Sequence, residues 1–287
     1  MSLNKIIWLA SYPKSGNTWT RVLLGNYLME SKEGLSINKL YNVTKHDVRQ
    51  DLYDRAAGRP FKAETFDDAI ALRPKVQRLI ASEAQGHQFV KTHSKIERIG
   101  HVDLILPEVT AAAIYIMRNP FDIAPSFAHH NAETIDETID RMVNPKMVVG
   151  SETKIMEVLG SWDGHVKSWL EAPGLPLHIV RYEDLISDTE KTVRRLMNFL
   201  QMPVHDGKLR RAIRMSSFKE LQKQELNQGF RERPKESESF FRKGKSGSWR
   251  EELSPEQVGR IREVFLPALE KYYPEMLKET EAFARGA

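Results

Sequence analysis

A short polar turn near the N-terminus carries residue types that bind anions. Residues 12–19 read Tyr-Pro-Lys-Ser-Gly-Asn-Thr-Trp, and apolar residues at helical spacing follow them. A helix N-terminus in this place offers free backbone N–H groups and the positive end of the helix dipole, and Lys14 adds a full charge, so a phosphate or sulfate could bind. The strict P-loop pattern is not met, because the lysine precedes the turn's single glycine. A surface turn without a ligand is the alternative at this point.

Two further stretches carry groups that could act on such an anion. His93 and Arg118 each follow a short apolar run, and Ser126 comes eight positions after the arginine. A histidine suits a general base near neutral pH, whereas the planar fork of an arginine suits bidentate contact with a phosphate. The alternatives are a structural or exposed histidine and an arginine that pairs with Asp122 or caps a helix.

The apolar runs predict the strands that position these groups. Each run is short, and turn or polar residues follow it, as at the carboxyl end of a strand. In an open parallel sheet, ligands bind outside the carboxyl ends of the strands, so we expect Lys14 and His93 to face one crevice. We predict a single α/β domain over residues 1–287, with a central parallel sheet flanked by helices and a P-loop-like turn. The predicted strands are residues 6–10, 88–91, 111–117 and 177–181.

Apolar residues at helical spacing predict the helices between and after these strands. We expect Pro74 to bend or interrupt the helix that contains it. The predicted helices are residues 19–28, 65–80, 154–170, 189–200 and one that begins at Ser254, where serine, proline and glutamine match a helix start. The expected loops are residues 33–59, with room for a short helix, 129–149 and 227–248, of which the second reads as a lid over the substrate.

Composition narrows the class of protein. Of the 287 residues, 40% are hydrophobic and 29% are charged, and the formal net charge is +4. These values are ordinary for a soluble protein, and the mild basic excess suits an anionic ligand without the clustering that nucleic-acid binding needs. We find no run of 18 apolar residues and expect no membrane span or membrane partner. The short first apolar run and the lack of cysteine favour a cytoplasmic protein.

The same stretches, in the same order, resemble motifs of the cytosolic-type sulfotransferases, which use 3′-phosphoadenosine 5′-phosphosulfate (PAPS). Residues 12–19 are similar to the family's 5′-phosphosulfate loop, and Lys91-Thr92-His93 is similar to the segment with its catalytic base. Arg118 and Ser126 keep the spacing of the 3′-phosphate motif. The other similar segments are Tyr-Glu-Asp-Leu from Tyr182, Ser-Ser-Phe-Lys-Glu from Ser216, and Arg-Lys-Gly from Arg242.

The resemblance implies a role for each motif. His93 would accept the proton of the attacking hydroxyl or amine, and Lys14 would neutralise charge on the oxygen that departs with the 5′-phosphate. Ser126 would contact the 3′-phosphate and hold Lys14 back until the donor is bound, and no metal is required. The implied nucleotide-binding residues are Lys14, Ser15, Gly16, Asn17, Thr18, Trp19, Arg118, Ser126, Tyr182, Ser216, Phe218, Phe241, Arg242, Lys243 and Gly244.

PAPS is then a co-substrate, PAP is the product, and a small molecule with a hydroxyl or an amine is the expected acceptor. The resemblance also suggests a bacterial member of the family, and a homodimer is one option for its assembly. Departures from the family pattern are Ser94-Lys95 after the histidine, Pro125 before Ser126, and Ser248. Two other functions remain: a P-loop-like nucleotide kinase or NTPase, against which the misplaced lysine argues, and a non-catalytic binder of polyanions such as nucleic acid.

Overall fold

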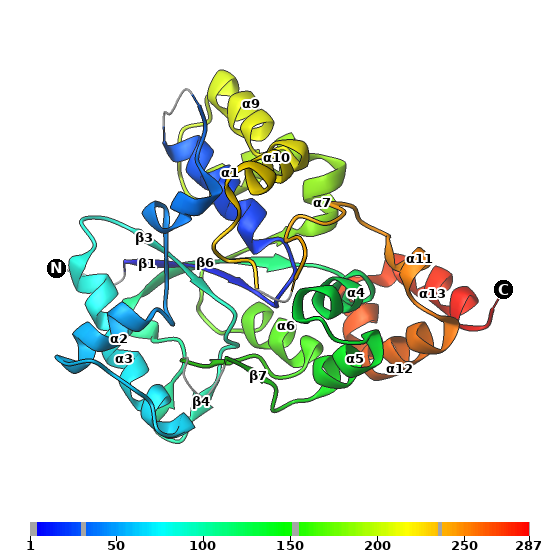
Figure 1. The fold of residues 1–287 in the computed structure, drawn as a ribbon, viewed down its shortest axis with the longest axis horizontal. Helices are drawn as coiled ribbons and strands as arrows, with labels where there is room; N and C mark the ends of the chain where they lie inside the picture. Colours follow the sequence, from blue (N-terminus) through cyan, green and yellow to red (C-terminus); the bar gives the residue numbers. More distant parts are fainter. Residues whose placement is uncertain (1–4, 30–32, 151–154, 235–236, 287) are drawn as a thin grey trace.

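Five parallel strands form the central sheet of the molecule, in the order β2-β3-β1-β6-β9 (Figure 1). The computed structural model describes residues 5–29, 33–150, 155–234 and 237–286. Each of the four strands predicted from the sequence is present, so the predicted α/β fold with a parallel sheet is confirmed. The strands of the sheet are β1 (Ile6–Ser11), β2 (Thr44–His46), β3 (Gln88–Thr92), β6 (Thr110–Met117) and β9 (Leu177–Arg181).

Helices cover both faces of this sheet (Figure 1). One face carries α1 (Asn17–Leu28), α7 (Tyr182–Ser187), α8 (Thr189–Phe199) and α9 (Asp206–Met215), with α10 (Phe218–Gln228) beside α1. The other side holds α2 (Gln50–Ala57), α3 (Phe66–Glu83), α4 (Pro120–Asn131), α5 (Ile135–Val143), α6 (Trp162–Leu170), α11 (Trp249–Glu252), α12 (Pro255–Tyr272) and α13 (Leu277–Ala284). The short elements are η1 (Ile37–Asn42), η2 (Pro107–Val109), η3 (Pro274–Met276), β4 (Arg98–Ile99), β5 (Val102–Asp103), β7 (Val148–Val149) and β8 (Glu157–Val158).

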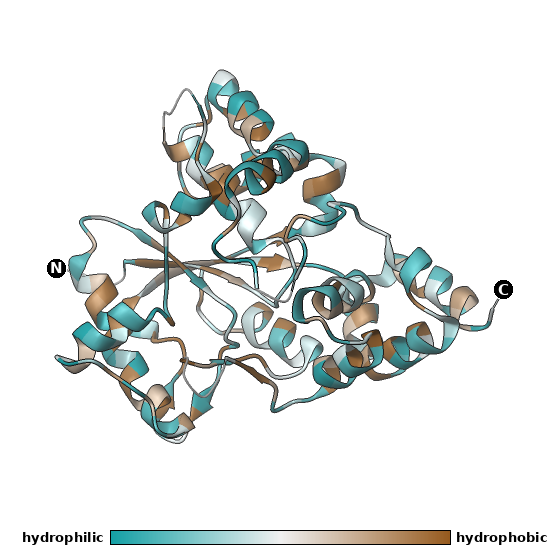
Figure 2. Cartoon of the chain, in the orientation of Figure 1, coloured by the Kyte–Doolittle hydropathy of each residue, from teal (hydrophilic) through white to brown (hydrophobic). Residues whose placement is uncertain are grey.

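Alternation along the strands divides the apolar core into two layers. In β1, Trp8 and Ala10 belong to one buried cluster, whereas Ile7 and Leu9 belong to the cluster on the opposite face. Successive side chains of a strand point to opposite faces, so a strand buried on both sides reads as a continuous apolar run. Figure 2 shows hydrophobic colour along the central strands and mixed colour on the outer helices, as this burial requires.

The predicted helix over residues 154–170 is wrong for residues 155–161, and its first residue lies outside the described ranges. Glu157 and Val158 form β8, which pairs antiparallel with β7, and the helix begins only at Trp162. Gly160 has a φ of 64°, and the Ser161 side chain accepts a hydrogen bond from the Gly164 N–H as the N-cap. A left-handed residue followed by a cap ends one element and starts the next, and the apolar spacing does not reveal that break.

The structure confirms some of the remaining predictions for helices and loops and corrects others. The stretch 33–59 contains a short helix, α2, as the sequence allowed, but it also contains β2 and η1, which were not predicted. Pro74 lies inside an α3 that continues across it, whereas the helix start at Ser254 is confirmed as a capping box with Gln257. The expected lid contains α5, and Tyr182 begins a helix. None of the helices that the structure describes is long and apolar enough to span a membrane.

Candidate active site

The turn between β1 and α1 has the backbone shape of an anion-binding loop. Lys14 and Gly16 have left-handed φ values of 66° and 100° on either side of Ser15. In the part of the chain that the structure describes, no side chain caps the N-terminus of α1, and the buried Ser15 hydroxyl has no hydrogen-bond partner. Uncapped N–H groups and an orphaned buried hydroxyl fit a bound anion. The Asn17 amide instead donates to the Leu9 carbonyl at 2.9 Å and braces the turn.

A cavity of about 320 Å³ gathers most of the predicted site residues where β1, β3 and β6 end. Two of the predicted residues, Ser15 and Ser216, belong to the described chain but are not among those that line the cavity. The predicted residues that line it are Lys14, Gly16, Asn17, Thr18, Trp19, His93, Arg118, Ser126, Tyr182, Phe218, Phe241, Arg242, Lys243 and Gly244.

Ser216 has a structural position. Its hydroxyl accepts a hydrogen bond from the Asn26 amide at 2.9 Å, and its carbonyl accepts one from the Trp19 indole at 2.8 Å. Both groups are therefore used to tie α1 to the segment before α10. Ser216 orients Trp19, and its own hydroxyl faces a protein partner.

Three aromatic rings line the part of the cavity next to the anion turn. Trp19 and Tyr182 meet edge to face, with ring centroids 5.8 Å apart. A Cβ atom built on Gly16 would lie 2.6 Å from the Tyr182 ring, and one built on Gly244 would lie 2.3 Å from the Phe218 ring. Both glycines therefore allow the backbone to approach an aromatic face, and such faces suit a purine ring.

His93 is fixed through its ring and its main chain. Its Nδ1 lies 2.7 Å from the Ser11 carbonyl oxygen, so Nδ1 carries the proton and Nε2 keeps a free lone pair. The main-chain N–H donates to Glu157 Oε1 at 2.6 Å, and the carbonyl accepts from His165 Nε2 at 3.0 Å. Burial, followed by the charge of Lys91, lowers the pKa of His93 to about 4. The imidazole is consequently neutral at physiological pH and able to accept a proton.

Lys14 is a partly desolvated cation. Its Nζ lies 3.3 Å from His130 Nδ1 and 4.3 Å from the centroid of the Phe240 ring. Burial, with the charges of Arg118 and Arg242 next, lowers the pKa of Lys14 to about 7. Ser126 lines the same cavity, but the lysine head group makes its polar contact with His130, one turn further along α4. The restraint of Lys14 by Ser126 stays a prediction.

Arg118 joins the two loops that border the cavity. Its guanidinium donates to the Lys14 carbonyl and to the Lys245 carbonyl, each at 3.1 Å, and it lies 4.3 Å from the Tyr182 ring centroid. Its Nε has no hydrogen-bond partner among the described residues. Arg118 also lies 3.9 Å from Asp122. It therefore forms the ion pair that was the alternative to phosphate binding, and it also lines the cavity.

The loop that leads into α11, residues 241–248, is anchored at its C-terminal end and carries positive charge at its N-terminal end. Asp122 accepts hydrogen bonds from the N–H groups of Gly247 and Trp249, at 2.8 and 3.1 Å. Arg242 and Lys243 both pair with Glu252, the lysine at 3.1 Å. Lys243 also lies 3.6 Å from the exposed Glu251. Arg242 and Lys243 both line the cavity, where their head groups can donate hydrogen bonds to a phosphate.

Several lining residues escaped the sequence analysis. Lys91 belongs to the segment that carries His93 and could have been included, because successive odd positions of a strand share a face. The other residues lie in stretches that were predicted as lid, helix or loop, where spacing carries no signal. Among them are His130, Asn131, Val149, Glu157, Glu232, Phe240 and Lys245, and the cavity is also lined by Pro13, Phe127, Leu221 and Ser248.

Known proteins share both the sequence pattern and the fold. The family model described as the sulfotransferase domain matches residues 4–274. The flavonol 3-sulfotransferase of Flaveria bidentis is 24% identical over 268 residues, which cover 89% of this chain and 78% of that protein. Cytosolic sulfotransferase 10 of Arabidopsis thaliana is 24% identical over 270 residues, which cover 89% of this chain and 75% of that protein.

The fold agrees with this match. The crystal structure of a mouse sulfotransferase complexed with PAP superposes with a TM-score of 0.64 at 20% identity, covering 99% of this chain and 90% of that one. The family match spans nearly the whole chain and includes the anion turn, His93 and Arg118. The chain therefore belongs to the sulfotransferase domain family, and it is a PAPS-dependent sulfotransferase.

Proposed function

We propose that this protein transfers the sulfuryl group of PAPS to a hydroxyl or amine of a small-molecule acceptor, with His93 as the general base. The observation that carries the proposal is the arrangement of His93. Its Nδ1–H bonds the Ser11 carbonyl, which leaves Nε2 as a proton acceptor in the cavity that Lys14 and Arg118 also line.

The donor nucleotide fits groups that otherwise lack partners. Within the described chain, the buried Ser15 hydroxyl, the Arg118 Nε and the uncapped N-terminus of α1 have no protein partner. We assign the anion turn to the 5′-phosphosulfate, and Arg118 with Arg242 and Lys243 to the 3′-phosphate. A buried donor without a partner raises the free energy of the ligand-free protein. An anion that accepts a hydrogen bond from it therefore binds more favourably, because the donor was desolvated before binding.

The residues divide the transfer step between them. His93 Nε2 takes the proton as the acceptor oxygen or nitrogen forms its bond to sulfur. The bond from sulfur to the bridging oxygen breaks, the electron pair stays on the 5′-phosphate of PAP, and Lys14 stabilises that charge. In sulfuryl transfer, the protein itself takes little part in making or breaking bonds. Positioning of the reactants and preorganised charge therefore supply most of the rate acceleration.

The acceptor side of the cavity is partly apolar. Phe127, Val149 and Phe240 line it, together with the carboxylates of Glu157 and Glu232. This mixture supports a small acceptor with an apolar body and at least one polar group. The name of the flavonol relative points to the same class of acceptor.

We further propose a cytoplasmic site of action, in keeping with the name of the Arabidopsis relative. A homodimer stays a prediction, which sedimentation of the purified protein can check. Neither proposal affects the chemistry at His93.

The test is a screen for sulfated products. Purified protein is incubated with PAPS and a panel of phenols, alcohols, amines and glycosides, and mass spectrometry measures PAP and sulfated product. We expect equal amounts of both for at least one phenol or alcohol. ATP with Mg²⁺ serves as the control substrate, and its turnover in the absence of any PAPS-dependent product would favour the kinase alternative.

A further inference from the structure

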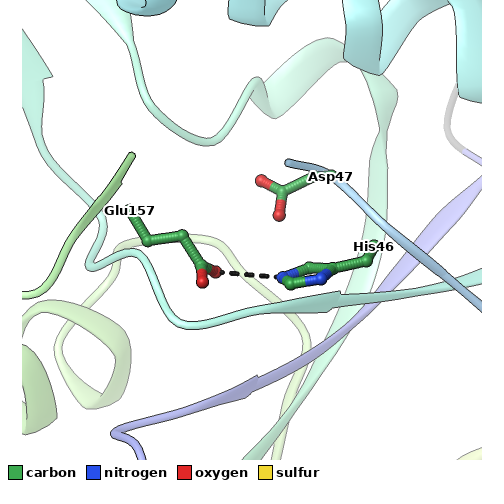
Figure 3. Close-up of side chains that lie close together, drawn as sticks. All are labelled: His46, Asp47 and Glu157. Carbon is green, nitrogen blue, oxygen red and sulfur yellow. Dashed lines mark hydrogen bonds and ion pairs between the residues drawn. The ribbon is translucent and has the colours of Figure 1, made fainter. Parts of the chain in front are cut away.

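Glu157 is a buried carboxylate that contacts the proposed base. Its Oε1 accepts the main-chain N–H of His93 at 2.6 Å and lies 3.4 Å from His46 Nε2 (Figure 3). The residue is 6% exposed, and it lines both the main cavity and a neighbouring hollow that His46 also lines. It comes from β8, an element that the sequence pattern did not predict.

The charge of Glu157 is paired differently from that of other buried carboxylates. Burial acts to raise the pKa of Glu157, but His46, His93 and Lys91 together outweigh it and hold the pKa below its usual range. The residue is therefore ionised at neutral pH. Its ion-pair partner within the described chain is a histidine, whereas the other buried carboxylates have arginines: Asp47 with Arg73, Asp122 with Arg118, and Glu225 with Arg233.

A buried carboxylate without a permanently charged partner contributes little to stability. Removal of the carboxylate from water costs free energy. A histidine offsets this cost less than an arginine does, because it carries a charge only when it is protonated. A role beyond stability is therefore the better explanation for this side chain.

Metal binding is one candidate role, because ligand atoms of His46, Asp47 and Glu157 lie within 4.8 Å of one another (Figure 3). The protein already uses one oxygen of each carboxylate, although Asp47 Oδ1 is buried without a hydrogen-bond partner among the described residues. Asp47 pairs with the fully buried Arg73, and Glu157 Oε1 holds the His93 N–H. A cation bound to Asp47 would lie close to the buried guanidinium of Arg73, whose charge opposes it, so the geometry favours a role of Glu157 toward His93.

The strand that carries Glu157 is clamped to the segment that carries the base. The Lys95 N–H donates to the Val158 carbonyl at 2.8 Å, and the Val158 N–H donates to the Ser94 hydroxyl at 3.3 Å. With the Glu157 contact, these bonds hold three consecutive residues after β3. Any shift of Glu157 consequently moves the main chain of His93.

We propose that Glu157 is a positioning residue for sulfuryl transfer: it fixes the main chain of His93 and keeps a negative charge beside the imidazolium that forms when the base accepts its proton. The inference rests on the proposed role of His93. In a desolvated site, a fixed charge of opposite sign stabilises a developing charge strongly and needs no reorganisation. His46 completes the arrangement from β2, at the edge of the sheet.

The charged and polar groups around the imidazole make the effect measurable. Burial and Lys91 lower the pKa of His93, Glu157 raises it, the bond to Ser11 raises it, and His46 lowers it. Replacement of Glu157 by glutamine keeps an oxygen acceptor for the His93 N–H and removes only the charge. The pKa of His93 is then expected to fall further.

The test compares Glu157→Gln and Glu157→Ala with Glu232→Gln. The control removes a carboxylate that lines the same cavity but contacts Arg21 and Lys91. Three quantities are measured: kcat with saturating PAPS, PAP affinity by calorimetry, and the His93 pKa by NMR titration of its imidazole. We expect Glu157→Gln to lower kcat about 10-fold and Glu157→Ala roughly 10- to 100-fold, within the range of a general-base contribution.

PAP affinity should change less than about twofold in Glu157→Gln, because that variant leaves the nucleotide contacts in place. The His93 pKa falls more in Glu157→Gln than in Glu232→Gln, because Glu232 contacts Lys91 and acts on His93 only through the charge of that lysine. A wild-type kcat with an unmoved His93 pKa in Glu157→Gln would overturn the proposal. So would a kcat loss matched by an equal loss of PAP affinity, since that pattern indicates structural damage.

A double variant separates this inference from the proposed base. In a His93→Ala background, Glu157→Gln is expected to cause no further loss of kcat, because its effect passes through His93. A further loss equal to that in the wild type overturns the positioning role. Normal turnover in His93→Ala alone would instead refute the base, whatever Glu157 does.

Discussion

Raising the pH above 7 is expected to weaken nucleotide binding through Lys14. Burial and neighbouring cations lower the pKa of this lysine to about 7 in the free protein. A group with that pKa is about half protonated at pH 7 and about 1% protonated at pH 9. A bound anion favours the charged lysine, so binding takes up a proton, and affinity falls about tenfold for each pH unit above 7.

The size of the effect follows from the same pKa. Between pH 7.5 and 9.5, the protonated fraction of Lys14 falls roughly 70-fold, and PAP affinity falls by a similar factor if Lys14 stays protonated in the complex. The phosphates of PAP are almost fully ionised over this range, since their second pKa is about 6, and they add little slope of their own.

Calorimetry in two buffers of different ionisation enthalpy measures both the affinity and the proton uptake. Wild-type protein is expected to take up about 0.9 proton per PAP at pH 8. Lys14→Met removes the titrating group and serves as the control, with weaker binding and no such slope. Wild-type affinity that is constant from pH 7.5 to 9.5, or an equal slope in Lys14→Met, would refute this account of the lysine.

Two further predictions concern the 3′-phosphate contact and the glycine of the anion turn. Arg118→Ala is expected to weaken PAP at least 10-fold but adenosine 5′-monophosphate much less, because a charge-assisted phosphate contact is lost; equal calorimetric losses for both nucleotides would remove Arg118 from the 3′-phosphate site. Gly16→Ala combines a left-handed φ with a Cβ 2.6 Å from the Tyr182 ring, whereas Gly174 has a φ of 70° and open space around it. By urea denaturation, Gly16→Ala is expected to lower the free energy of unfolding by about 1 to 3 kcal/mol more than Gly174→Ala does. Equal losses would mean that the Tyr182 contact adds nothing.

The sheet could be predicted from the sequence because its central strands are buried on both faces. Residues such as Ile6, Ile7 and Trp8 form an unbroken apolar run, and polar residues mark where the strand ends. The carboxyl ends of the predicted strands placed Lys14 and His93 in one crevice, and the structure brings both of them, with Arg118, to one cavity.

The edges of the site could not be predicted, because they depend on pairing between distant residues. β2 has three residues and β8 has two, too few for a periodic signal. Glu157 lay within a stretch whose apolar spacing matched a helix, and only its pairing with β7 turns it toward His93. The position of Ser216 behind Trp19 is likewise set by contacts across the fold.

The partners of Lys14 illustrate the same limit. The motif predicts Ser126 near the lysine, and both residues line the cavity. The lysine head group, however, makes its polar contact with His130, from the stretch that was expected to form a lid. Side-chain choice among neighbours on a helix depends on the local packing, which one sequence does not specify.

Turnover of His93→Ala tests the central claim most directly. The purified variant and the wild type are compared for PAPS-dependent formation of sulfated product with the best acceptor from the panel, and calorimetry measures PAP affinity for both. We predict a loss of about 100-fold or more in kcat with PAP affinity within about twofold of the wild type, because the base is removed and the nucleotide contacts remain. Near wild-type kcat in His93→Ala would contradict the assignment of the base.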